Sequence, residues 1–131
     1  MRIILIILFI ISSFFCFSQQ TQLEMNETAY KNYEQADKEL NVTYQKILKE
    51  YKTDTAFIKN LKAAQRIWVQ FRDAEVKAIY PDREPGYYGS IQPLCKYNYL
   101  ADFTTERTKK LKMWLDGAEE GDVCSGSIKA K

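Results

Sequence analysis

The stretch LKAAQRIWVQFRDAEV, residues 61–76, decides the fold of this chain. Set on a helix at about 100° per residue, it aligns one stripe that combines apolar residues with a glutamine and an arginine. The stripe consists of Leu61, Ala64, Gln65, Trp68, Arg72 and Ile79. An amide and a fixed positive charge are costly to bury without partners. We therefore expect Gln65 and Arg72 to face the interior and to find hydrogen-bonding partners there.

Two further helical segments flank this one, and no strand pattern accompanies them. The first is expected at about residues 23–51, because apolar residues recur there at spacings of three and four. They are Ala29, Tyr33, Ala36, Leu40, Tyr44, Ile47 and Tyr51. The quoted stretch itself belongs to a helix expected at about residues 54–80, with Thr53 or Asp54 as its N-cap, and the short link before it makes these two helices antiparallel.

The third helix follows YPDREPGYYGS, residues 80–90, whose prolines and glycines interrupt any helix. Ser90 is the expected N-cap, and Pro93 is tolerated in the first turn. Its inward residues are expected to be Tyr97, Leu100, Thr104, Leu111 and Leu115, with Trp114 alongside. The sequence thus predicts an all-α fold, a small antiparallel three-helix bundle with an extra turn at the C-terminus as an option.

Polar residues from all three helices fall at one level of this bundle. Asp37 lies close to the stripe of the first helix, and Arg107 lies on the inner edge of the third. A buried charge is tolerated when it is paired and its other donors are bonded. We expect a structural polar clamp of Asp37, Gln65, Arg72 and Arg107, in which Arg72 bridges to Asp37 and Gln65 fills the gap.

The N-terminus has the pattern of a signal peptide. Arg2 precedes an apolar run of about 15 residues, which suits a signal sequence and is short for a membrane span. We expect residues 1–18 to be the signal peptide, and residues 19–131 to form one exported domain with its core at about 23–116 and a polar tail at 117–131. The expected location is the periplasm or the extracellular space, without a membrane anchor.

The numbers of cysteines and histidines and the net charge exclude several classes of protein. Cys95 and Cys124 remain after cleavage, and an even pair in an oxidising compartment predicts a disulfide. The chain has no histidine, which argues against a Cys/His zinc site, and we expect neither a metal nor a cofactor. The formal net charge is +2, with no basic stripe of the kind that nucleic-acid binding needs.

Four segments carry a resemblance to a known family. They are ADKELNVTY (36–44), LKAAQRIWVQFRDAE (61–75), Gly89-Ser90 and TTERTKKL (104–111). Together they resemble the LprI-type lysozyme inhibitor family over about residues 25–115. The resemblance implies a small exported helical domain without catalytic activity, with lysozyme as a possible protein partner.

The cysteines depart from the pattern of that family. Its members usually carry cysteines where Glu27 and Val76 stand and near Tyr99, whereas this chain has Cys95 and Cys124 instead. One covalent link would therefore have been exchanged for another, which puts in doubt any function that depends on the relatives' disulfides.

The loop after the second helix is the predicted partner-binding site. An inhibitor of lysozyme must insert a protruding segment into a cleft that carries a pair of carboxylates. Arg83 can pair with a carboxylate there, while Tyr87, Tyr88 and Ser90 offer contact area and hydroxyl donors. The alternative is that this segment is an ordinary helix connector, and the low net charge gives little electrostatic steering towards a basic enzyme.

Two other functions stay open. The first is a cell-envelope binding module for a cell-wall glycan or another exported protein, for which exposed tyrosines would provide stacking surfaces. The second is an enzyme that uses carboxylates alone, such as Glu34 with Asp37 or Asp73 with Glu75. Such spacings are common on helix surfaces, so we expect no enzymatic activity.

Overall fold

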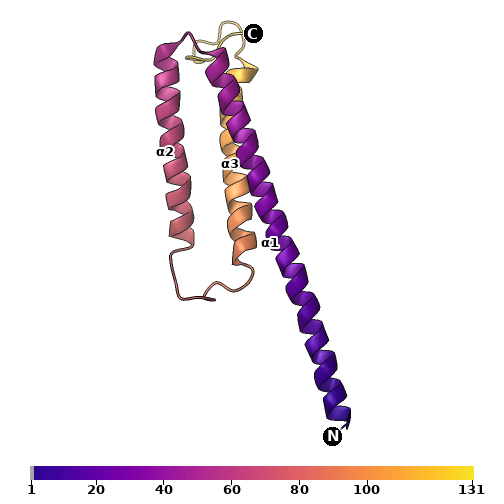
Figure 1. Cartoon of the computed structure of the whole chain (residues 1–131). Coiled ribbons are helices and arrows are strands. Elements are labelled where there is room, and N and C mark those ends of the chain that lie inside the picture. Colours follow the sequence, from indigo (N-terminus) through magenta and orange to yellow (C-terminus); the bar gives the residue numbers. More distant parts are fainter. Residues whose placement is uncertain (1) are drawn as a thin grey trace.

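The protein is an all-α bundle of three helices (Figure 1). The computed structural model describes the backbone of residues 2–131 and the side chains of residues 21–131. The helices are α1 (Arg2–Glu50), α2 (Thr55–Ile79) and α3 (Gln92–Asp116). Each runs antiparallel to the next, so α1 and α3 point the same way. The predicted antiparallel three-helix bundle is therefore confirmed.

α1 is longer than the sequence pattern predicted, because its helical backbone begins at Arg2 instead of near Leu23. It projects well beyond the other two helices at their loop end (Figure 1). The expected signal peptide, residues 1–18, lies outside the part of the chain whose side chains are described. No helix in the described part is long and apolar enough to cross a membrane.

Local chemistry explains where α2 and α3 begin. Asp54, not Thr53, is the N-cap of α2, and its Oδ1 accepts a hydrogen bond of 2.9 Å from the backbone N–H of Phe57. The N-cap of α3 is Ile91, without a capping side chain, and Pro93 lies in the first turn as predicted. The expected cap Ser90 is therefore wrong. Its carbonyl oxygen instead accepts a 3.0 Å hydrogen bond from Asn26 Nδ2, which ties the loop to α1.

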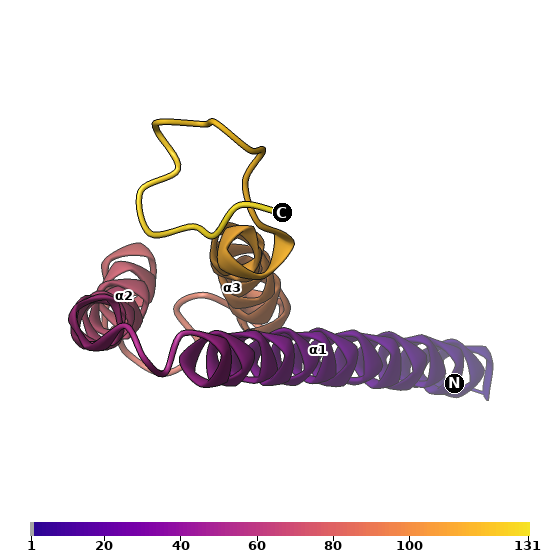
Figure 2. The ribbon, with the colours of Figure 1, turned by 90° about the horizontal axis from the view of Figure 1, so that it is seen from above.

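The hydrophobic core lies in the half of the bundle nearest the α1–α2 turn. α3 packs closely along α1, whereas α2 stands farther from both (Figures 1 and 2). Long side chains therefore fill the space between α2 and its neighbours. The core residues are Leu40, Ile47, Tyr51, Phe57, Leu61 and Leu111.

The stripe of α2 is rotated slightly from the expected one. Gln65 and Arg72 are both buried, each with 8% of its surface exposed, as the sequence predicted. Ile79, expected on this stripe, is 43% exposed, and Val76 is buried in its place. Val76 is one turn beyond Arg72 and continues the spacing of four, whereas Ile79 lies in the last turn.

The expected disulfide between Cys95 and Cys124 is wrong. Both residues are exposed free cysteines. Cys95 lies in the first turn of α3 and Cys124 lies beyond its other end. At 1.5 Å per residue, α3 alone separates the two ends by roughly 30 Å, whereas a disulfide needs Cα atoms within about 7 Å.

Hydrogen bonds hold the C-terminal tail instead. The tail turns at Gly117, and Lys131 N–H donates to the carbonyl of Ala118 at 3.0 Å. The buried Tyr51 hydroxyl donates to the Trp114 carbonyl at 2.9 Å and accepts from the backbone N–H of Lys129 at 3.2 Å. The tail is thus folded back onto the top of the bundle (Figure 2).

Candidate functional site

A polar layer crosses the bundle next to the core, and Arg72 of α2 is its best-paired residue. Arg72 Nη1 lies 3.2 Å from Asp37 Oδ1 on α1, and Arg72 Nε lies 3.0 Å from Asp73 Oδ1 on its own helix. Burial alone would lower the pKa of Arg72. The hydrogen bond to Asp73, the charges around it and the hydrogen bond to Asp37 outweigh burial and raise that pKa.

Arg107 of α3 makes the second contact of the layer. Its Nε donates a 3.0 Å hydrogen bond to Gln65 Oε1, which links α3 to α2. Trp68 lies between the two arginines, with its ring centre 5.4 Å from Arg72 Cζ and 5.9 Å from Arg107 Cζ. The indole therefore has a guanidinium near it from two helices, and each contact is of the cation–π kind.

The four residues expected as a clamp thus form two pairs. Asp37 contacts Arg72, and Gln65 contacts Arg107 and not Arg72. Asp73 as a second partner of Arg72, and Trp68 as the group near both arginines, were not expected from the sequence. The stripe position of Trp68 was a signal for its place, but the Asp73 contact joins chain neighbours, which helical spacing does not reveal.

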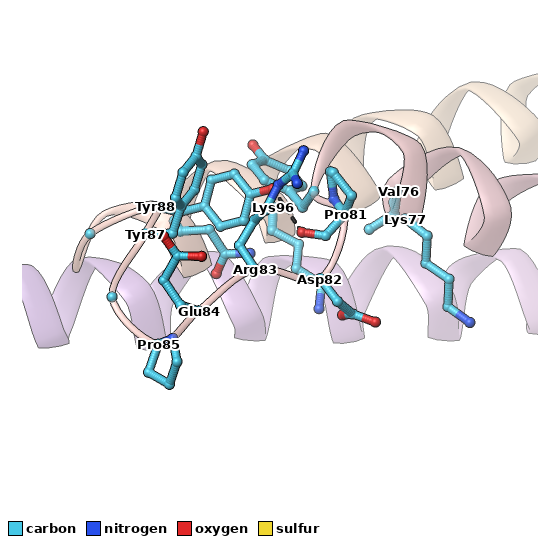
Figure 3. A pocket seen from close by; sticks show the side chains of 14 residues that line it. Val76, Lys77, Pro81, Asp82, Arg83, Glu84, Pro85, Tyr87, Tyr88 and Lys96 are labelled. Atoms are coloured by element: carbon cyan, nitrogen blue, oxygen red, sulfur yellow. Dashed lines mark hydrogen bonds between the residues drawn. The ribbon is translucent and has the colours of Figure 1, made fainter.

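The loop between α2 and α3 forms a shallow depression of about 420 Å³ at one end of the bundle (Figure 3). Fourteen residues line it, from the last turn of α2, the loop and the first turns of α3. The base is fixed, because the Tyr88 hydroxyl donates a 2.8 Å hydrogen bond to the Pro81 carbonyl. The Tyr88 ring also packs edge-on against Tyr80, with ring centres 5.6 Å apart.

The structure brings three of the four predicted contact residues together. Tyr87 is 60% exposed and its ring lies edge-on to Tyr88, with ring centres 4.9 Å apart. Arg83 Cζ lies 5.7 Å from the ring centre of Tyr87, so the two side chains form one exposed surface (Figure 3). Ser90 does not line the depression, since its carbonyl faces Asn26 of α1.

Among the described residues, the carboxylates considered above as catalytic pairs do not contact each other in the way that was considered. Asp37 and Asp73 both bind Arg72, so each belongs to a different pair from the expected one. Glu75 Oε2 is buried without a hydrogen-bonding partner among the described residues. Burial, and then the Glu75 carboxylate, raise the pKa of Tyr99. Among residues 21–131, no group of acidic, cysteine or histidine side chains is arranged to hold a metal ion.

The fold and this loop define a small helical domain with an exposed aromatic loop at one end. The chain belongs to the family described as lysozyme inhibitor LprI, whose model matches residues 16–111. The family is one of lysozyme inhibitors. Inhibition is a noncatalytic role, and the family name implies lysozyme as the possible partner.

A curated relative is similar over most of both chains. It is an uncharacterised protein, R02472, of Rhizobium meliloti strain 1021. It is 30% identical over 115 residues, which cover 79% of this chain and 81% of the relative. No solved structure matches the chain significantly.

Proposed function

We propose that this protein is an exported, noncatalytic inhibitor that binds lysozyme and occludes its cleft with the loop between α2 and α3. Membership of the inhibitor family is the observation that carries the proposal. Export follows from the signal-peptide pattern of residues 1–18.

The loop geometry supports this choice of contact surface. Tyr87 and Arg83 are exposed together at the end of the bundle, on a base fixed by the bond between Tyr88 and Pro81. A rigid aromatic side chain loses little conformational entropy on binding. The Arg83 guanidinium matches a cleft carboxylate, with which arginine forms charge-assisted hydrogen bonds.

The test is a titration of the purified protein against chicken-type and goose-type lysozymes, with lysis of cell walls as the readout. The loop variant is Arg83→Ala with Tyr87→Ala. The matched control is Arg66→Ala with Ile67→Ala, because these residues are also exposed and Ile67 is 60% exposed, as Tyr87 is. We expect saturable inhibition that the loop variant loses and the control retains.

The other outcomes separate the parts of the proposal. Inhibition that survives in a folded loop variant would keep the function and move the contact surface to a helix face. If neither lysozyme is inhibited at micromolar protein, the proposal that this protein is a lysozyme inhibitor is rejected.

One observation favours a second candidate, the cell-envelope glycan module. The tyrosines line a depression that also contains polar and charged groups, including Gln92 and Lys96. Aromatic faces beside hydrogen-bonding groups suit a sugar. Binding of soluble cell-wall fragments, lost in the same loop variant, would favour this function if lysozyme is not inhibited.

A further inference from the structure

A second hollow lies between α2 and α3, away from the loop. This groove has a volume of about 480 Å³. Its apolar wall consists of Phe57, Leu61, Ala64 and Trp114. Its polar groups are Arg107 at one end, Asp54 and Ser127 towards the other, and Asn60 between them. Ligand sites typically combine such an apolar lining with a few placed polar groups.

Arg107 brings a positive charge to this groove, and its partners, the Gln65 amide and the Trp68 ring, are neutral. It is half-buried, and its Nε is bonded to the neutral amide of Gln65. Among the side chains of residues 21–131, no carboxylate lies within ion-pair distance of it, whereas Arg72 in the same layer has two. Burial accordingly lowers the pKa of Arg107, while the pKa of Arg72 is raised. A carboxylate brought by a ligand would supply the missing partner.

The two ends of the groove also carry opposite charges. Arg107 is bonded at the level of Gln65, and Asp54 lies 11 residues earlier on α2, which corresponds to roughly 16 Å along the helix. The Asp54 carboxylate repels an anion at that end, so the two ends differ in charge. Phe57 and Trp114, with ring centres 5.6 Å apart, form the apolar wall nearest to Asp54.

We propose that this groove binds a small ligand that carries a carboxylate at one end of an extended apolar chain, namely a medium-chain fatty carboxylate. The carboxylate pairs with Arg107, and the chain lies along Leu61 and Ala64 towards Phe57 and Trp114. This site is separate from the loop at the α2–α3 connection, so its test does not depend on lysozyme inhibition.

The two tryptophans of the chain make the proposal measurable. Trp114 lines the groove and Trp68 lies against Arg107, so all tryptophan fluorescence arises next to the site. The full chain is titrated with decanoate below its micelle concentration, and with decanol as the uncharged counterpart. We expect saturable quenching or enhancement with decanoate, and binding of decanol at least tenfold weaker.

Three variants locate the ligand. Arg107→Gln removes the charge and is expected to weaken decanoate binding at least tenfold, because the charge-assisted hydrogen bonds to the carboxylate are lost. Arg66→Gln removes an exposed arginine from α2 and is expected to leave binding unchanged. Ala64→Trp fills the apolar wall from an exposed helix position, leaves Arg107 in place and is expected to abolish binding.

Several results would overturn the proposal. Equal affinity for decanol and decanoate would mean that Arg107 does not pair with the ligand. Undiminished binding by Ala64→Trp would mean that the apolar chain of the ligand binds outside the groove. Arg107→Gln is judged only if circular dichroism shows it folded, and Ala64→Trp decides the matter if it is not. A dimer in sedimentation that Ala64→Trp dissociates would assign the groove to a second copy of the chain.

Discussion

Arg72 and Arg107 lie in the same polar layer on neighbouring helices, but different groups surround their charges. Arg72 has a carboxylate from α1 and another from its own helix, and Arg107 has an amide. Helical periodicity predicted that Gln65 and Arg72 are buried, because it fixes the direction in which each residue faces. The expected contact of Arg72 with Asp37 is present, but Asp73 as a second partner of Arg72 and Arg107 as the partner of Gln65 were not expected. Those choices depend on side-chain rotamers and on the offset between helices.

Replacement of Arg72 by methionine tests the structural role of the layer. The variant loses two charged hydrogen bonds and the cation–π contacts with Tyr33 and Trp68, while the apolar stem is kept. We expect the free energy of unfolding in urea to fall by about 1.5–3 kcal/mol. Arg66→Met, at an exposed position, is the control and is expected to change it by less than about 0.5 kcal/mol. An unchanged melting temperature for Arg72→Met would contradict the role of clamp.

The raised pKa values of several tyrosines predict that the protein loses stability at alkaline pH. Burial is the main cause that raises the pKa of Tyr33, Tyr44, Tyr80 and Tyr99 above the ordinary value of about 10. Above about pH 10 the unfolded chain therefore binds fewer protons than the folded one, and the free energy of unfolding decreases as pH rises. Urea unfolding between about pH 8 and about pH 11 measures the slope. The slope is expected to be shallower in Tyr99→Phe, and an identical slope there would exclude that residue as a contributor.

Among the elements, the three helices were predictable from periodicity and from breakers, but their exact ends were not. Thr53 and Asp54 are both residue types that cap helices, and the bond to Phe57 identifies Asp54 as the cap. The loop prolines and glycines correctly separated α2 from α3. The packing partner of the tail was not predictable, because its contacts with Tyr51 and Trp114 join residues far apart in the sequence.

Gly117, directly after the end of α3, is the position at which the packing of the C-terminal tail against the bundle is most easily tested. Its φ of 78° and ψ of 169° suit essentially only glycine, and a Cβ there would lie 2.6 Å from Lys131 Cγ and 3.1 Å from the Lys129 carbonyl oxygen. We expect Gly117→Ala to lower the free energy of unfolding by about 1–3 kcal/mol. We also expect faster hydrogen exchange at the amides of Ala118 and Lys131.

Gly121→Ala is the matched control for this change. Gly121 also has a positive φ, of 87°, but a Cβ there would meet nothing within 4 Å. This change also places a side chain at a positive φ, but without the contact with the end of the tail. Equal exchange rates at Ala118 and Lys131 in the two variants would show that the close approach at Gly117 does not hold the tail.

At the scale of the whole molecule, the two hollows lie in different parts of the bundle. A contact surface on the loop was expected from the sequence, since connectors run over the surface, but as a protruding segment, whereas the structure has a shallow depression there. The groove beside Arg107 was not expected, because it exists only where α2 stands away from α3, and no local pattern specifies that spacing. The family match covers residues 16–111, which include the whole lining of the loop depression but not Trp114 and Ser127 of the groove.

The close pairing of α1 with α3 also has a consequence for the order in which the chain folds. The tightest contacts join the first and third helices, which point the same way, so contacting residues such as Tyr51 and Trp114 are 63 positions apart. Closing a loop of that length is entropically costly. We expect the transition state to contain the α1–α3 pair, with α2 docking afterwards. In stopped-flow kinetics, Leu111→Ala should then slow folding, whereas Leu61→Ala should mainly accelerate unfolding. The reverse pattern would place the α1–α2 hairpin first on the pathway.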